Sequence, residues 1–204
     1  MLPRLYAIID AGILSARAIS LTQFTSELAE AGVSLIQYRA KNVAPQQILE
    51  AVAGIRTVFS GTLVLNDRSD IAVLANADGV HVGQDDLTPK DARAIVGPNH
   101  LIGISTHNDD QVRVADLTAA SYIAIGPVFA TGSKLNPDPI IGLEGVRRAR
   151  ALTSKPLVAI GGITRDNARS VIEAGADSVA VISGLIAAGE PVAKVARDFL
   201  DVLR

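Results

Sequence analysis

The feature of this sequence that most constrains its fold is a regular alternation of short apolar runs with segments of helical periodicity. Eight runs rich in valine and isoleucine cover residues 5–9, 34–38, 63–66, 79–82, 101–105, 122–126, 157–161 and 178–183. Runs that are apolar throughout, rather than at every second position, are typical of strands covered on both faces, as in a parallel sheet. Eight strands that alternate with helices predict an α/β fold, and favour a closed (β/α)8 TIM barrel over an open doubly wound sheet.

The segments between the runs have the pattern of crossover helices. They cover residues 21–32, 45–59, 68–77, 89–97, 108–120, 144–153, 165–175 and 191–203. Three of them lead into a strand through similar sequences, AEAGVSLIQ, ANADGVHVG and IEAGADSVAVI, which indicates repeated βα units. No linker or low-complexity tract interrupts this pattern, so we expect residues 1–204 to form a single TIM-barrel domain.

Composition and charge exclude several classes of function. The formal net charge is -2, so the chain has no overall basic field to attract nucleic acid or an anionic membrane. Aromatic residues make up only 3%, and no window reaches the roughly 18 uninterrupted apolar residues of a membrane span. Cysteine is absent, which excludes disulfides and thiol catalysis and fits a reducing cytoplasm. We expect a soluble, cytoplasmic protein that binds neither nucleic acid nor membrane.

Polar residues follow the predicted strands at the ends where a TIM barrel carries its active site. They are Gln37, Arg39, Lys41, Asn66, Asp67, His81, Gln84, Asp85, Asp86, Ser105, His107, Thr131, Ser133, Lys134, Gly161, Gly162, Ser183 and Gly184. The segment 127–142 is the one long connection, and its length is typical of a lid or a binding loop. The sequence therefore predicts an active site at this end of the barrel.

Two carboxylates and three cations form the first candidate group. Asp67 and Asp86, on neighbouring strand ends, can share Mg²⁺, which prefers a few carboxylates together with waters and phosphate oxygens. Equally, each could cap the helix that follows it. Arg39, Lys41 and Lys134 could clamp a diphosphate together with the metal, although solvated surface charge is the alternative interpretation.

Glycines after the last two strands form the second group. Gly161 and Gly162 separate an apolar strand from a helix start, where free backbone N–H groups bind phosphate in many barrels. The segment 182–184 could supply the other half of such a site. A tight turn that requires glycine is the alternative.

The three histidines do not have the spacing of a zinc site. His81 faces either the barrel interior or the helix layer, and we expect His107 at the rim.

Six motifs along the whole chain resemble the thiamine phosphate synthase family in order and spacing. These are QYRAK, LVLNDRSDIA, GVHVGQDDL, GISTH, GPVFATGSK and AIGGITRDNA. Their combination is specific, although AIGGI alone occurs in many phosphate-binding barrels. The resemblance implies an enzyme that joins 4-amino-2-methyl-5-(diphosphooxymethyl)pyrimidine to 4-methyl-5-(2-phosphooxyethyl)thiazole, or to its carboxylated form, and releases pyrophosphate. We therefore expect a transferase of thiamine biosynthesis that transfers a substituted-methyl group.

The resemblance also assigns roles to residues. The pyrimidine diphosphate would contact Gln37, Tyr38, Arg39, Ala40, Lys41, Asn66, Ser105 and Lys134. The thiazole phosphate would contact Thr131, Gly132, Ser133, Gly162, Ile182 and Ser183. Asp67 and Asp86 would hold Mg²⁺. The family often reads QLREK and TxTK where this chain has Tyr38, Ala40 and Ser133. These departures keep the cations of both motifs, and Ser133 keeps a hydroxyl, but Ala40 lacks the carboxylate of the family's motif.

The implied mechanism is dissociative. Lys134, Ser105, Arg39 and Lys41 are the expected catalytic residues, and the cations with Mg²⁺ stabilise charge that grows on the departing pyrophosphate. The C–O bond breaks early and leaves a cation on the pyrimidine methylene, which the thiazole nitrogen captures. No protein nucleophile or strong base is required, and closure of the long loop would exclude water.

These residues favour this function over two rival ones. A thiazole tautomerase-like isomerase typically has a catalytic histidine where this chain has Pro127, and the retained aspartates argue against it. A non-catalytic phosphate-binding barrel would have no need for both carboxylates and all three cations. The sequence leaves open whether the protein is a monomer or a homodimer.

Overall fold

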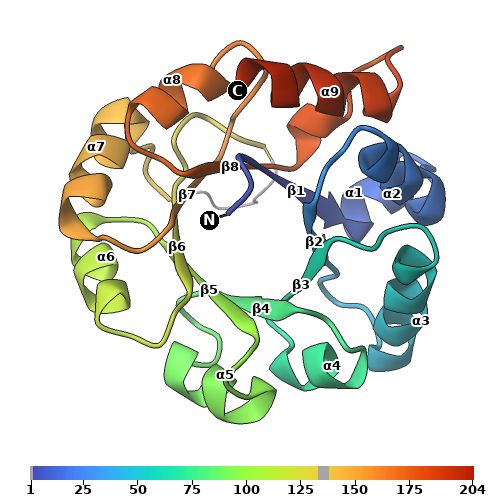
Figure 1. The fold of residues 1–204 in the computed structure, drawn as a ribbon, viewed down its shortest axis with the longest axis horizontal. Helices are drawn as coiled ribbons and strands as arrows, with labels where there is room; N and C mark the ends of the chain where they lie inside the picture. Colours follow the sequence, from blue (N-terminus) through green and yellow to red (C-terminus); the bar gives the residue numbers. More distant parts are fainter. Residues whose placement is uncertain (1, 133–137) are drawn as a thin grey trace.

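The computed structural model describes residues 2–132 and 138–204, and its strands form a closed barrel surrounded by helices (Figure 1). The strands pair in parallel and in chain order, and the last pairs with the first. They are β1 (Leu5–Asp10), β2 (Leu35–Arg39), β3 (Thr62–Asn66), β4 (Gly79–Val82), β5 (Leu101–Thr106), β6 (Tyr122–Ile125), β7 (Leu157–Ile160) and β8 (Ser178–Val181). The predicted (β/α)8 barrel is confirmed, with strand ends within two residues of the expected ones.

Every predicted helical segment contains a helix. The helices are α1 (Ala11–Ala16), α2 (Leu21–Glu30), α3 (Pro45–Arg56), α4 (Ser69–Leu74), α5 (Pro89–Val96), α6 (Asp109–Asp116), α7 (Gly142–Leu152), α8 (Ala168–Glu173) and α9 (Val192–Val202), with a 3₁₀ turn η1 (Ser183–Leu185). Only α1 and η1 were not predicted. Both are too short to show helical periodicity, and α1 begins because the Asp10 carboxylate accepts a hydrogen bond from the Ile13 N–H.

Side chains alternate between two separate apolar layers. The barrel interior is filled by Tyr6, Ile8, Leu35, Val64, Tyr122, Ala124, Val158 and Ala180. A larger cluster, which includes Phe24, Ile36, Val80 and Phe199, fills the space between barrel and helices. Because successive residues of a strand face opposite sides, Gln37 and Arg39 share the interior face of β2, whereas Tyr38 belongs to the outer cluster.

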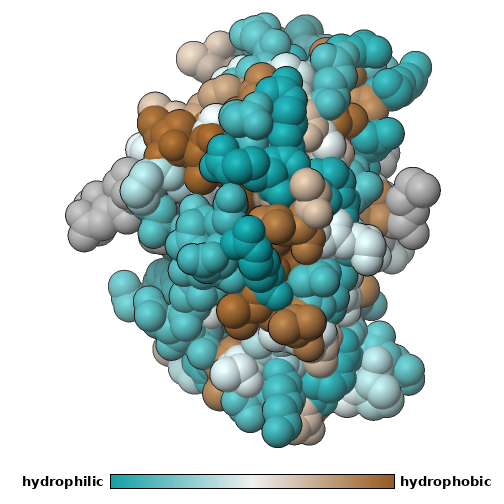
Figure 2. Space-filling model, turned by 90° about the vertical axis from the view of Figure 1, so that its left-hand side faces the viewer, coloured by the Kyte–Doolittle hydropathy of each residue, from teal (hydrophilic) through white to brown (hydrophobic). Residues whose placement is uncertain are grey.

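The side of the molecule over α6 and α7 is mainly hydrophilic (Figure 2). Figure 2 shows the side that lies at the left of Figure 1, over α6 and α7, where apolar areas are separated by hydrophilic ones. Val114 and Leu117, in and just after α6, are among the exposed large apolar side chains. Among the residues that the structure describes, none of the helices combines the length and apolarity that crossing a bilayer requires.

Candidate active site

The two mouths of the barrel differ in chemistry. A cavity at the N-terminal ends of the strands is lined mostly by apolar residues, among them Leu2, Leu35 and Leu101. Many of the residues at and after the C-terminal ends are charged or polar. They meet at one mouth because the strands are parallel and all their following turns lie on the same side. The candidate site is therefore at the C-terminal mouth, where the sequence predicts it.

Arg39 is held at this mouth by a residue that the sequence analysis missed. Asp10 ends β1 directly opposite Arg39 in the register, and its carboxylate forms an ion pair with the Arg39 guanidinium. Asp10 is only 8% exposed, so this pair is poorly screened by solvent. The same strand-end position that identified the other polar residues would have identified Asp10, which directly follows the run LYAII.

Asp67, Asp86 and Lys41 form one charged group. Lys41 pairs with Asp67, and the Asp67 and Asp86 carboxylates are within hydrogen-bonding contact of each other. Burial raises the pKa of Asp67, and Asp86 raises it further, although the hydrogen bond from Lys41 opposes both effects. The Asp86 carboxylate also accepts a hydrogen bond from the Gly83 N–H at 2.8 Å.

This group fits a divalent cation better than helix capping. The N-cap positions of α4 and α5 are occupied by Arg68 and Thr88, so neither aspartate caps the helix that follows it. Two adjacent carboxylates repel each other unless they share a proton or a cation. Mg²⁺ takes few carboxylates and completes its coordination with water and phosphate oxygens. Within the described ranges, no group of three or more His, Cys, Asp or Glu side chains converges.

His81 lies inside the barrel, which resolves the choice that its strand position left open. Its Nδ1 is 2.9 Å from the Tyr122 hydroxyl, and its Nε2 is 2.9 Å from the Ser105 hydroxyl. Burial lowers the pKa of His81 to about 4, so the imidazole is neutral at pH 7. His107 lies at the rim, as expected, with Nδ1 2.7 Å from the Gly126 carbonyl oxygen.

The glycine-lined half of the mouth is built by close backbone approaches. Gly162 has a φ of 63°, and a Cβ on it would lie 2.7 Å from the Phe129 Cβ. The Phe129 N–H also donates to the Gly161 carbonyl oxygen at 3.0 Å. A Cβ on Gly184 would lie 2.8 Å from the Ile163 carbonyl oxygen. These contacts bring the turns that carry Thr131, Gly132, Ile182 and Ser183 next to Gly162.

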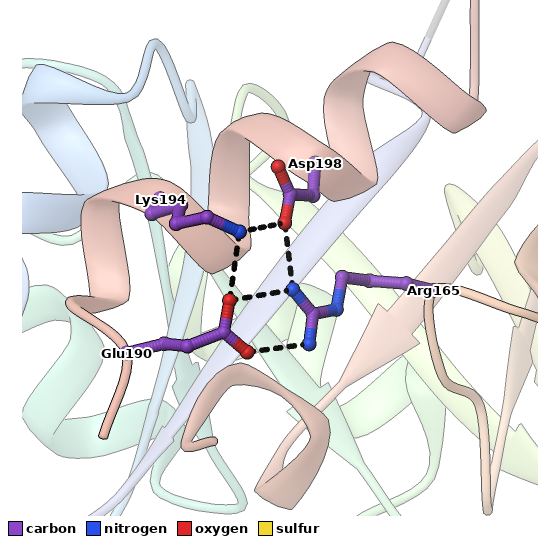
Figure 3. Close-up of polar contacts among 4 residues, drawn as sticks. All are labelled: Arg165, Glu190, Lys194 and Asp198. Atoms are coloured by element: carbon purple, nitrogen blue, oxygen red, sulfur yellow. Dashed lines mark hydrogen bonds and ion pairs between the residues drawn. The ribbon is translucent and has the colours of Figure 1, made fainter. Parts of the chain in front are cut away.

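Four charged side chains brace this half from outside (Figure 3). Arg165 follows β7, and its guanidinium nitrogens lie 2.7 Å from Glu190 and 2.6 Å from Asp198. Lys194 bridges the same two carboxylates at 2.7 and 2.9 Å. Hydrogen bonds from Arg165 and Lys194 lower the pKa of Glu190 to about 2. The network ties the turn after β7 to α9.

Two predicted residues contribute to the mouth differently from the rest, and two others cannot be placed. The Tyr38 side chain is 5% exposed in the outer cluster, so only the main chain of residue 38 is left to face a ligand. Ala40 packs at the edge of the same cluster. Ser133 and Lys134 lie outside the described residues, and their assignment to the two substrates stays a prediction.

Comparison with known proteins agrees with this geometry. Residues 5–185 match the family model described as thiamine monophosphate synthase. A thiamine-phosphate synthase of Koribacter versatilis is 52% identical and covers 99% of this chain and 96% of its own, and that of Methanosarcina mazei is 37% identical, covering 98% and 82%. The solved thiamine phosphate pyrophosphorylase of Pyrococcus furiosus has a TM-score of 0.86 at 32% identity and covers 98% of this chain and 95% of its own. The chain belongs to the thiamine monophosphate synthase family.

Proposed function

We propose that this protein is a thiamine-phosphate synthase, an enzyme that joins the pyrimidine diphosphate and the thiazole phosphate named above and releases pyrophosphate. One observation carries the proposal: a carboxylate and cation group at the ends of β2–β4 shares one barrel mouth with a glycine-lined group at the ends of β7 and β8. The first suits a diphosphate with its metal, and the second suits a phosphate monoester.

Mg²⁺ is part of the proposal, with Asp67 and Asp86 as its protein ligands. The ion, when bound, would neutralise charge on the diphosphate. Lys41 pairs with Asp67, and its side chain is half exposed. Lys41 is therefore free to exchange the Asp67 carboxylate for a diphosphate oxygen when the substrate arrives.

The chain's own residues act on the leaving group. Arg39, Lys41 and Lys134 stabilise the negative charge that accumulates on pyrophosphate as the C–O bond to the pyrimidine methylene breaks. The electron pair of that bond leaves with pyrophosphate, and the thiazole nitrogen forms the new C–N bond with its lone pair. Ser105 contributes a hydrogen bond to the pyrimidine diphosphate. The reaction transfers a substituted-methyl group and requires no proton abstraction by the protein.

The proposal also covers the cellular location and the oligomeric state of the protein. We place the reaction in the cytoplasm, because its substrates are phosphorylated small molecules. A homodimer is supported by the exposed apolar side chains of Val114 and Leu117, and light scattering in solution measures it directly.

Pyrophosphate release is the direct test. Purified protein should release pyrophosphate only when both substrates and Mg²⁺ are present, and omission of any one of the three should abolish the release. Comparing the thiazole phosphate with its carboxylated form tells which is the better acceptor. Failure to release pyrophosphate with either acceptor would overturn the proposal and return the function to an isomerase or a non-catalytic phosphate binder.

A further inference from the structure

A chain of hydrogen bonds crosses the barrel interior and joins two predicted substrate residues. Gln37 Nε2 donates to the Tyr6 hydroxyl at 2.9 Å, and that hydroxyl is 2.9 Å from the Tyr122 hydroxyl. The Tyr122 hydroxyl is 2.9 Å from His81 Nδ1, and His81 Nε2 is 2.9 Å from the Ser105 hydroxyl. The chain begins and ends at the pyrimidine part of the site, but its three middle members have no role in the proposed reaction.

The donors and acceptors of this chain can be followed from one end to the other. The amide nitrogen of Gln37 can only donate, so the Tyr6 oxygen accepts this hydrogen bond. The Tyr6 hydroxyl is buried and its hydrogen needs an acceptor, which the Tyr122 oxygen at 2.9 Å provides. Tyr122 then donates its single hydrogen to His81 Nδ1. A neutral imidazole that accepts at Nδ1 carries its hydrogen on Nε2, where it donates to the Ser105 oxygen. The Ser105 hydrogen and the Gln37 Oε1 are left for a ligand.

Burial keeps each member of the chain in the neutral form that this pattern requires. Tyr6 and Tyr122 are each 1% exposed, and burial raises the pKa of both phenols, so both keep their hydrogen. His81 is 8% exposed, and burial lowers its pKa, so it carries only one ring hydrogen near pH 7. A neutral buried chain of this kind has one hydrogen for each bond and leaves no member unsatisfied.

A glycine makes room for the centre of the chain. Gly103 lies between His81 and Tyr122 in the strand register, and a Cβ on it would collide with the Tyr122 hydroxyl and with His81 Nδ1. The Tyr6 and Tyr122 rings pack edge to face with centroids 5.9 Å apart. The rings are therefore fixed by packing as well as by hydrogen bonds.

We propose that Tyr6, Tyr122 and His81 are positioning residues that preset Ser105 as a hydrogen-bond donor, and the Gln37 carbonyl as an acceptor, toward the pyrimidine diphosphate. The identity of that ligand rests on the proposed function, whereas the direction of the chain does not. The consequence is selectivity, because a ligand with the opposite arrangement of donors and acceptors would leave buried polar groups unpaired.

The tautomer of His81 tests the direction without any substrate. Nitrogen-15 NMR of the ligand-free protein distinguishes the Nε2–H from the Nδ1–H form, and the spectrum of His81→Asn assigns the signal among the three histidines. We expect the Nε2–H form at pH 7. Observation of the Nδ1–H form would overturn the proposal, because Ser105 would then donate to His81 rather than to a ligand.

Tyr122→Phe tests the positioning role. Loss of this hydroxyl interrupts the chain, so the KM for the pyrimidine diphosphate should rise about fivefold to tenfold while the KM for the thiazole phosphate is unchanged. The His81 ring nitrogens should shift in the same variant. The matched control is Ser178→Ala, which also removes a buried hydroxyl. The Ser178 hydroxyl lies at the opposite mouth of the barrel, where it donates to the Arg4 carbonyl oxygen at 3.3 Å.

The outcomes separate this proposal from the proposed function. Equal KM values for the pyrimidine diphosphate in Tyr122→Phe, Ser178→Ala and the unaltered protein would mean that the chain is only structural. If Tyr122→Phe does not fold, the His81 tautomer of the unaltered protein still decides the direction. Absence of pyrophosphate release in the unaltered protein would overturn the function but not the Nε2–H expectation.

Discussion

The two halves of the C-terminal barrel mouth are built in different ways. The half at the ends of β1–β4 is made of side chains, in which Lys41 pairs with Asp67 and Arg39 with Asp10. The half at the ends of β7 and β8 is made largely of backbone, with Gly162 packed against Phe129. Paired side chains can exchange partners, but a backbone held by close packing cannot.

This difference suits what each proposed ligand does in the reaction. Charge on the pyrophosphate grows as its bond breaks, so groups that strengthen their contacts in the transition state accelerate the reaction there. The phosphate of the thiazole keeps the same charge throughout the reaction. It therefore needs only hydrogen-bond donors whose positions do not change. Substitutions in the first half should therefore change turnover, and substitutions in the second should change affinity.

Asp67→Asn should have the largest effect. Turnover should fall about a hundredfold to a thousandfold, because the proposed metal loses one of two carboxylates. Asparagine tolerates the φ of 62° at this position. Because burial and Asp86 raise the pKa of Asp67, its charge is unfavourable in the folded protein, and the melting temperature should stay the same or rise. Steady-state kinetics and a thermal melt measure both effects.

The control for this substitution is Asp70→Asn. Asp70 lies three residues from Asp67 in the first turn of α4 and is exposed. Its carboxylate pairs with Arg68 rather than with Lys41. Near-normal turnover of Asp67→Asn at saturating Mg²⁺ would contradict the metal assignment.

Gly162→Ala should have the second largest effect, on affinity instead of turnover. The new Cβ would meet the Phe129 side chain and the Ala130 carbonyl oxygen, so the turn must shift. We expect the KM for the thiazole phosphate to rise at least about tenfold while the KM for the pyrimidine diphosphate stays unchanged.

Gly142→Ala isolates the cause of that effect. Gly142 has the same φ of 63°, but a Cβ there has open space around it. Both variants place a side chain at the same positive φ, and only Gly162→Ala adds a collision. Equal KM values for the thiazole phosphate in the two variants would contradict a packed, backbone-made phosphate site.

The two halves were also predicted from the sequence to different degrees. Strand positions and the side-chain half followed from apolar runs and from the polar residues after them, because parallel strands bring those residues to one mouth. The close approach of the turn after β6 to Gly162 depends on the packing of segments distant in sequence. Local patterns carry no information about such contacts. The glycine pattern indicates Gly162 and the segment 182–184, whereas the roles of Thr131, Gly132 and Ser133 follow only from the resemblance to the family.

The buried chain shows a second limit of sequence patterns. Tyr6 and Tyr122 occur inside apolar runs, where a tyrosine counts as one more hydrophobic residue. Their hydroxyls are paired across the barrel between strands that are not adjacent, β1 and β6. The two tyrosines become neighbours only in the closed barrel. Their positions in the sequence therefore could not reveal the hydrogen bond between their hydroxyls.

The smallest expected effect concerns the ion network that braces the backbone half (Figure 3). Arg165 and Lys194 lower the pKa of Glu190 to about 2 from an ordinary value of 4.5. A carboxyl whose pKa is lowered in the folded protein adds stability above its unfolded pKa, and loses that contribution as the pH falls toward the folded value. The network is exposed to solvent, so its contribution should be modest and weaker at high salt.

Glu190→Gln should therefore lower the melting temperature by only about 1 to 3 °C at pH 7. The difference from the unaltered protein should be constant above about pH 5 and shrink between pH 4.5 and 2, where the native Glu190 becomes protonated. Glu173→Gln is the matched control, since Glu173 forms a single exposed pair with Arg169. A difference that stays constant down to pH 2 would mean that the charge of Glu190 does not brace the turn after β7.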